Sequence, residues 1–159
     1  MVVTLPVDRR ETVDRVVTRH MYDADIPALV CLWFSAYPDG VTADTTYDAE
    51  VADWEAAFGG QYGRLIPEAS IVAVEGVAII GAVATVLDAP WDNTPPGPFI
   101  IELFVHPGWR RQGIAEVLMC RALAALHSAG YSSAGLRVDV GNEPARCLYK
   151  KLGFVDWWC

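Results

Sequence analysis

The segment from residue 99 to residue 129 constrains the fold most, because it places a strand, a tight turn and a long apolar helix directly after one another. The β-branched and aromatic run at 99–105 predicts the strand. Apolar residues at helical spacing then predict a helix from Gly113 to about residue 129, with Gly130 as its C-cap. A helix N-terminus leaves backbone N–H groups unpaired and is partly positive, so this junction can bind an anion such as pyrophosphate.

The turn itself, Arg110-Arg111-Gln112-Gly113-Ile114-Ala115, differs from the two common phosphate-binding motifs. The chain contains neither the G-x-x-x-x-G-K-[ST] of a P-loop nor the G-x-G-x-x-G of a dinucleotide fold. We expect Gly113 to let the backbone approach the phosphates, and Arg110 and Arg111 to add positive charge.

The rest of the chain predicts further strands and helices around this unit. Two β-branched runs, at 70–74 and 78–87, are separated by Glu75-Gly76 and predict a hairpin of central strands. Pro27 marks the start of an apolar helix through residue 36. The order of elements predicts a single-domain α/β (α+β) protein with a mixed central sheet flanked by helices. The other expected elements are a polar extension at 1–14, a strand at 16–20, a turn at 38–40, a helix at 48–58, a loop at 89–98, a strand at 136–140 and a helix from Asn142 to Gly153.

Composition agrees with one globular domain, since 53% of the 159 residues are hydrophobic and only 20% are charged. No apolar stretch approaches the roughly 18 to 20 residues of a membrane span. Acids and arginines occupy the N-terminal region where a signal peptide needs an apolar run, so we expect a cytoplasmic protein without membrane association. The four cysteines form no C-x-x-C pair and have no histidine at zinc-ligand spacing, so we expect thiols and no metal.

Charge is distributed unevenly along the chain, whose net charge is −8. Residues 1–98 hold 5 Lys and Arg against 15 Asp and Glu, whereas residues 99–159 hold 7 against 5. The acidic balance disfavours nucleic acid as a partner, because binding to phosphates would be repulsive. Six acids between residues 39 and 55 have no intervening Lys or Arg, which fits either a solvated helix face or a field that attracts a cationic substrate.

Two motifs together resemble a known family. The run from Leu103 to Ala115 closely resembles the acetyl-CoA motif of the GNAT (GCN5-related N-acetyltransferase) superfamily, and Asn142-x-x-Ala145-x-x-x-Tyr149-x-x-x-Gly153-Phe154 resembles its second signature. The likeness covers residues 16 to 155. It implies a single-domain GNAT fold over residues 15–159, after an N-terminal extension at 1–14, with a mostly antiparallel sheet.

The resemblance implies acetyl-CoA as co-substrate. The loop from 110 to 115 would hold the pyrophosphate through backbone amides, and main-chain groups at 103–105 would pair with the pantetheine arm. Asn142 would hydrogen-bond the same arm, or would only cap the last helix. The cofactor-binding residues implied are Leu103, Phe104, Val105, Arg110, Arg111, Gln112, Gly113, Ile114, Ala115 and Asn142.

The resemblance also implies catalysis by direct attack of an amine on the thioester in a ternary complex. Tyr149 would act as general acid toward the departing thiolate. A backbone N–H near Phe104 or Val105 would polarise the carbonyl. Glu102 would take the amine's proton directly or through water, and a chain of waters is the alternative. Arg137 occupies the position of some relatives' base but cannot act as one; Asp139 and His106 are further candidates.

One departure from the family pattern concerns the C-terminal end. Further strands normally follow the Gly-Phe pair and help to form the acceptor groove, whereas only residues 155–159 remain here. Either the N-terminal extension or a neighbouring subunit of a homodimer would complete the sheet. We expect an N-acetyltransferase whose acceptor is an amine, a cationic small molecule or a protein amine. The alternatives are a catalytically silent acyl-CoA-binding sensor or interaction module, and a nucleotide-binding protein unrelated to CoA.

Overall fold

A computed structural model describes residues 1–7, 16–37 and 39–157 of the chain. Its centre is a seven-stranded sheet with the order β1-β7-β6-β5-β4-β2, in which β3 pairs with β5 beyond the end of β4. Among the pairs within these ranges, only β6 and β7 run parallel. The strands are β1 (Val2–Thr4), β2 (Val17–His20), β3 (Arg64–Leu65), β4 (Ile71–Glu75), β5 (Ala78–Leu87), β6 (Pro98–Val105) and β7 (Ser133–Leu136).

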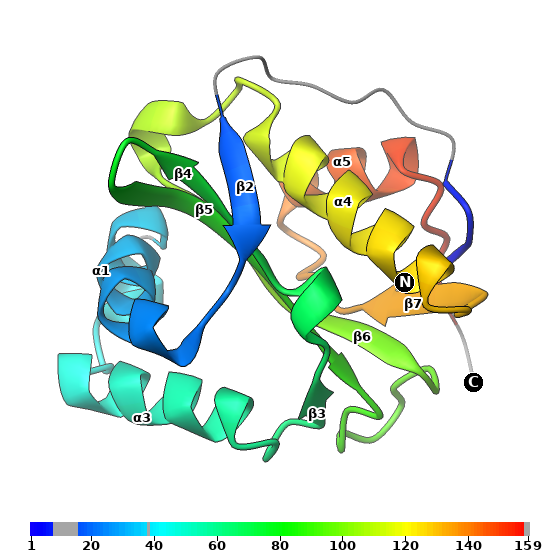
Figure 1. The fold of residues 1–159 in the computed structure, drawn as a ribbon, viewed down its shortest axis with the longest axis horizontal. Helices are drawn as coiled ribbons and strands as arrows, with labels where there is room; N and C mark the ends of the chain where they lie inside the picture. Colours follow the sequence, from blue (N-terminus) through cyan, green and yellow to red (C-terminus); the bar gives the residue numbers. More distant parts are fainter. Residues whose placement is uncertain (8–15, 38, 158–159) are drawn as a thin grey trace.

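Helices cover both faces of the sheet (Figure 1). One face carries α1 (Ile26–Ala36) and α3 (Tyr47–Phe58), with the short α2 (Asp39–Thr42) between them in sequence. The other face carries α4 (Ile114–Ser128) and α5 (Glu143–Lys151). No helix in the described part of the chain combines the length and apolar character of a membrane span.

The strands feed two hydrophobic cores because successive side chains point to opposite faces. On β5, Val83 belongs to the core under α4, while Ala82 and Ala84 belong to the core under α1. On β6, Val105 faces α4 and Phe104 faces α1. The continuous apolar runs that predicted central strands are therefore explained by burial on both faces.

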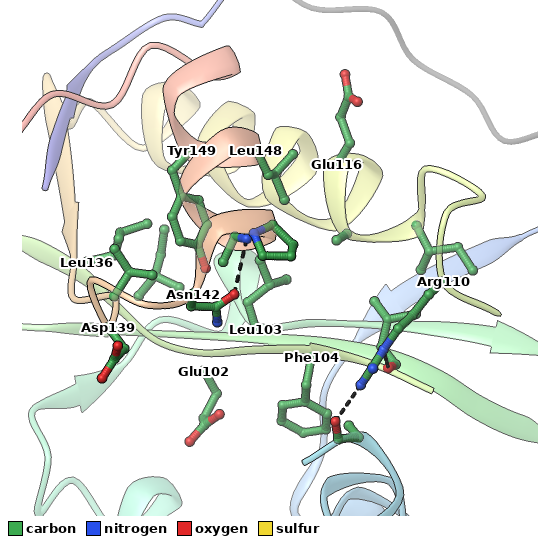
Figure 2. A pocket seen from close by; sticks show the side chains of 18 of the residues that line it. Glu102, Leu103, Phe104, Arg110, Glu116, Leu136, Asp139, Asn142, Leu148 and Tyr149 are labelled. Carbon is green, nitrogen blue, oxygen red and sulfur yellow. Dashed lines mark hydrogen bonds between the residues drawn. The ribbon is translucent and has the colours of Figure 1, made fainter. Parts of the chain in front are cut away.

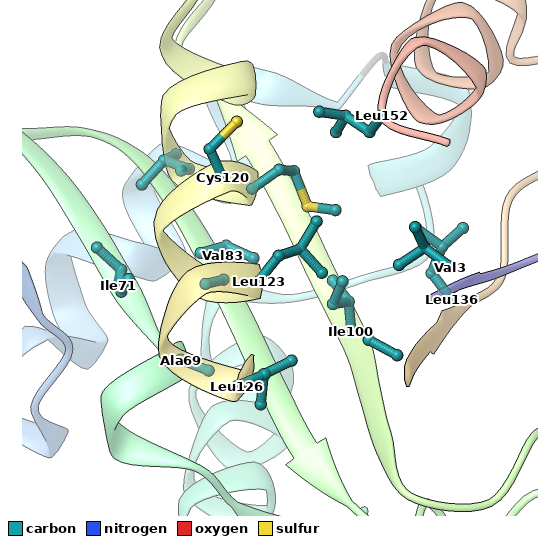
Figure 3. Packing of buried hydrophobic residues seen from close by; sticks show 14 of the residues in the cluster. Val3, Ala69, Ile71, Val83, Ile100, Cys120, Leu123, Leu126, Leu136 and Leu152 are labelled. Atoms are coloured by element: carbon teal, nitrogen blue, oxygen red, sulfur yellow. The ribbon is translucent and has the colours of Figure 1, made fainter. Parts of the chain in front are cut away.

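Helix α4 is the main cover of its face. Its residues Leu118, Leu123 and Leu126 are at most 1% exposed and pack over β5 and β6 (Figure 3). Gly81 of β5 permits this approach, since a Cβ there would lie 3.1 Å from Leu118 Cδ1 and 3.2 Å from Ile114 Cγ2. Truncating one of these leucines to alanine would cost about 2–5 kcal/mol.

Most expected elements are confirmed, including the hairpin of β4 and β5, whose turn has Gly76 at φ 59. The strand expected at 136–140 is wrong in position, because β7 spans Ser133–Leu136. β7 pairs with β6 only at Phe99–Gly135 and Ile100–Leu136, and beyond these residues β6 diverges, so Val138 and Val140 have no partner strand despite their β-branched pattern. The helix expected through residue 36 ends there as predicted, although residues 39 and 40 belong to the short α2 rather than to a turn; residue 38 lies outside the described residues.

The N-terminal segment is more than the polar extension we expected. Residues 2–4 form β1, which pairs antiparallel with β7 and forms a bridge from Val2 to Val155. Val3 and Leu5 are buried in the core under α4. Of the two ways to complete the sheet, the N-terminal segment is thus the one observed; residues 8–15 lie outside the described residues, and the homodimer stays a prediction.

Candidate functional site

The site lies where β6 and β7 separate. Their parallel pairing ends at Ile100–Leu136, yet β6 continues to Val105, so one side of its second half has no neighbouring strand. A cavity of about 950 Å³ occupies this gap and is lined by β6, the turn before α4, the segment after β7 and the start of α5. Figure 2 shows Leu103 and Tyr149 on one side of β6 and Glu102 and Phe104 on the other. The gap therefore connects the two faces of the sheet.

The backbone of β6 presents polar groups to this cavity. His106 N donates to Ile80 O at 2.9 Å, and Phe104 pairs opposite Ala82, so these residues direct their backbone groups toward β5. Because direction alternates along a strand, the N–H groups of Leu103 and Val105 face the gap. Of the two residues expected to supply an N–H to a carbonyl, the geometry favours Val105 over Phe104.

The turn before α4 supplies further donors. Gly113 is the N-cap in the left-handed region, at φ 81, and no side chain caps this helix. The first helical bond runs from Val117 N to Gly113 O at 3.0 Å, so the N–H groups of residues 114 and 115 precede the hydrogen bonds of the helix. Buried Ile114 anchors the helix end, while Gly113 and Ala115 line the cavity with little bulk. Uncapped donors at a positive helix end fit a pyrophosphate.

The polar side chains of the turn take different positions. Arg111, at φ 62, is exposed and lines the cavity. Arg110 also lines it, but its Nε donates to Val105 O at 3.2 Å and its Nη2 donates to Ala36 O. The Gln112 side chain donates to Gly108 O at 3.3 Å, and Gln112 is the one member of the predicted set that does not line the cavity. The two predicted phosphate-binding arginines therefore differ in their contacts.

Helix α5 brings two predicted residues to the same cavity. Asn142 caps α5, since its Oδ1 accepts from Ala145 N at 3.2 Å, and its amide nitrogen remains a donor. The Tyr149 ring packs against Phe154 with centroids 5.7 Å apart, and its hydroxyl points toward β6 (Figure 2). Burial, with a smaller contribution from Glu102, raises the pKa of Tyr149 to about 12. The phenol is thus protonated at neutral pH and can donate a hydrogen bond or a proton.

Glu102 lies across β6 from Tyr149, beside α1. Its Oε2 accepts a hydrogen bond from the Tyr37 hydroxyl at 3.1 Å. Burial, aided by the charges of Glu50 and Asp53, raises the pKa of Glu102 to about 7, and the Tyr37 hydrogen bond acts in the opposite direction. A carboxyl poised near neutral pH can accept a proton from an ammonium group, which is what a general base requires.

Sequence reasoning missed two residues near Glu102. Tyr37 lines the cavity from the C-cap of α1, and Glu50 of α3 is only 6% exposed. Burial, then the charge of Asp53, raises the pKa of Glu50 to about 7, while its interaction with the Trp54 side chain lowers it. Helical spacing carried a signal for Glu50, because it shares the buried stripe of α3 with Trp54 and Ala57. Nothing local to Tyr37 marks its contact with a residue 65 positions away.

The other base candidates are less well placed. His106 is exposed and lies outside the cavity lining, and its Nδ1 accepts from Gly108 N at 3.1 Å. Asp139 lines the cavity, but its Oδ1 accepts from Gly141 N at 2.7 Å. Arg137 donates to the carbonyl of Asp92 and to Thr94 Oγ1, as a side chain that cannot be a base. Across the described ranges no group of His, Cys, Asp and Glu could hold a metal ion.

Comparison with known sequences yields acetyltransferases. A sequence model of the acetyltransferase (GNAT) family matches residues 27–154. The chain is 35% identical over 91 residues to N-alpha-acetyltransferase 30 of Schizosaccharomyces pombe, which covers 57% of this chain and 60% of that protein. It is 30% identical over 131 residues to mycothiol acetyltransferase of Nocardiopsis dassonvillei, which covers 78% of this chain and 36% of that protein. The matches thus span 60% or less of the length of these relatives.

Comparison with solved structures yields the same fold. A GCN5-related N-acetyltransferase from Sphaerobacter thermophilus superposes with a TM-score of 0.71 and 21% identity, over 96% of this chain and 45% of that chain. AAC(6')-Iy in complex with the bisubstrate analogue CoA-S-monomethyl-acetylneamine gives a TM-score of 0.67 and 19% identity, over 89% and 91% of the two chains. At these identities the likeness concerns the fold.

Proposed function

The chain belongs to the acetyltransferase (GNAT) family, and from this premise we propose that it transfers an acetyl group from acetyl-CoA to an amine by direct attack in a ternary complex. The observation that carries the proposal is the gap beside β6, because uncapped amides lie at one end of it and Glu102 and Tyr149 lie across the strand from each other. The gap offers an anion cradle, a free strand edge, a proton acceptor and a proton donor in one cavity.

Acetyl-CoA would bind along the α4 and α5 face. The amides at 113–115 would hold the pyrophosphate, and Arg111 would add charge from the exposed side of the turn. Leu103 would pair with the pantetheine arm through its backbone groups, as an added strand does, whereas Val105 O accepts from Arg110 and the Val105 N–H faces the thioester. The amide of Asn142 would donate to the same arm. The thioester would then lie between Val105 and Tyr149.

The chemistry divides between the two faces of the sheet. Glu102 would take the proton of the ammonium group, directly or through water, so that the neutral amine attacks the thioester carbonyl carbon. The Val105 N–H would stabilise the oxyanion that forms. As the C–S bond breaks, Tyr149 would protonate the leaving thiolate and regain a proton from the former amine nitrogen, directly or through water, which leaves a neutral amide and free CoA.

We further propose that the acceptor is cationic. The carboxyl groups of Glu50, Asp53 and Glu102 act on one another electrostatically, and above pH 7, where Glu50 and Glu102 are mostly ionised, the acceptor side carries concentrated negative charge. Such a field attracts amines that are protonated in solution and raises their local concentration. The relative named N-alpha-acetyltransferase 30 fits an acceptor of this kind, since an α-amino group carries positive charge near neutral pH.

A panel of amines with acetyl-CoA, followed by release of free thiol, tests the proposal. We expect turnover with at least one cationic amine and little with neutral analogues of equal size. Titration calorimetry with CoA is the companion measurement. Binding of CoA without turnover for any amine would support a silent acyl-CoA-binding module instead, and the absence of binding at millimolar CoA would refute the proposal.

A further inference from the structure

Arg110, the first residue of the turn, spans the two halves of the site (Figure 2). Its Nε donates to Val105 O at the end of β6, and its Nη2 donates to Ala36 O at the end of α1. Ala36 is buried, and its carbonyl belongs to the last turn of α1, where carbonyls have no partner within the helix. One guanidinium group thus ties the cofactor loop to the end of a helix on the opposite face of the sheet.

The residue after Ala36 is Tyr37, and its position is fixed on several sides. Its backbone N donates to Trp33 O at 3.0 Å, and its ring lies 5.1 Å from the ring of Trp33 and 6.1 Å from that of Phe104. Its hydroxyl donates to Glu102 Oε2 at 3.1 Å. An unbroken series of contacts therefore runs from Arg110 through Ala36 and Tyr37 to Glu102.

We propose that Arg110 is a positioning residue that fixes the end of α1, and through Tyr37 orients the carboxyl group of Glu102, rather than a ligand of the phosphates. The proposal rests on the function proposed above. Both arginines are exposed and line the cavity, but two of the guanidinium nitrogens of Arg110 already donate to backbone carbonyls. The fork of the guanidinium suits two carbonyls on different elements, which a single ammonium group cannot bridge in the same way.

Loss of the hydrogen bond from Tyr37 to Glu102 should change the pH dependence of activity. Glu102 is faced by Tyr37 from the end of α1, by Glu50 and Asp53 from α3, and by Tyr149 from α5. Arg137 and Asp139 line the same cavity. Of the groups facing Glu102, Tyr37 donates a hydrogen bond to it, which holds its pKa lower than burial alone would. Displacing Tyr37 should therefore raise the pKa of Glu102 and move the acidic limb of activity to higher pH.

The test compares Arg110→Gln, Tyr37→Phe and the double variant, using kcat/KM for the amine from pH 5.5 to 9 and the Kd of acetyl-CoA. We expect each single variant to move the acidic limb up by about one pH unit, which lowers kcat/KM about fivefold at pH 7. The double variant should move it no further, because both changes remove the same hydrogen bond. The Kd of acetyl-CoA should stay within about threefold in Arg110→Gln and rise about tenfold in Arg111→Gln.

Three results would overturn the inference. One is an unchanged acidic limb in Arg110→Gln together with a tenfold weaker Kd for acetyl-CoA, which would make Arg110 a phosphate ligand. Another is an additive effect in the double variant. The third comes from a ¹³C NMR titration of the Glu102 carboxyl in the CoA complex, where an unchanged pKa in Arg110→Gln refutes the inference and a raised one supports it.

Two measurements distinguish the proposed role of Arg110 from a variant that fails to fold and from a failure of the proposed function. Arg110→Lys keeps the charge but not the fork, so it should move the acidic limb even if Arg110→Gln does not fold; an unchanged limb in this variant counts against the inference. The NMR titration needs no turnover. It therefore decides the role of Arg110 even if the amine panel shows no activity and the proposed function fails.

Discussion

The two faces of the sheet are built on different principles. On the face where we propose that acetyl-CoA binds, which we call the cofactor face, one short segment, residues 103–115, supplies both the strand edge and the turn, and only Asn142 and Tyr149 come from α5 and its N-cap. On the acceptor face, Tyr37, Glu50 and Glu102 come from α1, α3 and β6 and interact across long stretches of chain. The first face presents backbone donors and the second presents carboxyl groups. The comparison teaches that a shared co-substrate can be bound by local backbone geometry, whereas a particular acceptor requires side chains assembled by the fold.

The largest expected effect concerns Tyr149, whose hydroxyl points toward β6 from the cofactor face (Figure 2). Tyr149→Phe should lower kcat about 100-fold, because the leaving thiolate loses its proton donor. The Kd of acetyl-CoA should change less than twofold, since the ring remains. Tyr131→Phe on the same face, which removes a phenol outside the cavity lining, is the matched control. Equal turnover in the Tyr149 and Tyr131 variants would remove Tyr149 from the mechanism.

The next effect belongs to the acceptor face. Glu102→Gln should lower kcat/KM at pH 8 about 10- to 100-fold and abolish the acidic limb near pH 7, because the limb reports the carboxyl whose pKa burial raises to about 7. A pH profile of both proteins checks this. If the limb persists in the glutamine variant, another group or a chain of waters accepts the proton.

On the cofactor face, a change to the backbone of the turn before α4 should weaken acetyl-CoA binding. Gly113→Ala places a Cβ at φ 81, which disfavours the turn, and should weaken acetyl-CoA binding about tenfold by calorimetry. Gly130→Ala is the matched control, since Gly130 has φ 92 at the other end of α4 and open space around its Cβ position. The control should lose similar stability and no affinity. A similar loss of affinity in both variants would contradict the cradle.

The smallest effect concerns stability on the acceptor face. Burial raises the pKa of Glu50 from its ordinary value of 4.5 to about 7, so between these pH values the folded state binds more protons than the unfolded state. Unfolding free energy should therefore fall as pH rises through this window. Glu50→Gln should make the slope shallower, with the remainder due to Glu102, and stabilise the protein by about 1–2 kcal/mol at pH 8.

The same Glu50 variant also tests the acceptor's charge. Glu50→Gln should raise KM for a cationic amine a few-fold, because the field on the acceptor side weakens.

Urea titrations at pH 5 and pH 8, with Glu55→Gln on the exposed side of the same helix as control, measure the stability effect. Glu102 contributes its own slope over the same window, so a slope as steep in Glu50→Gln as in the unaltered protein would contradict the assigned burial of Glu50.

The difference between the faces also decided what could be predicted. The hairpin of β4 and β5, helix α4 and its N-terminal turn follow from β-branched runs, helical spacing and Gly113, which are all signals within about 30 residues. Strand β1 could not be predicted in this way, because Val2–Thr4 forms a strand only against β7. The expected strand at 136–140 failed for the opposite reason, since Val138 and Val140 have the pattern of a strand but no partner beside them.

The sequence by itself determined the family, the order of the central elements and the turn before α4, because each depends on residues close together in the chain. Only the tertiary structure decided that β1 closes the sheet, that Arg110 turns toward Ala36, and that Tyr37 and Glu50 surround Glu102. Backbone geometry is set by local sterics and hydrogen bonds. The pKa of a carboxyl, in contrast, is set by burial and by charges that distant segments bring to it.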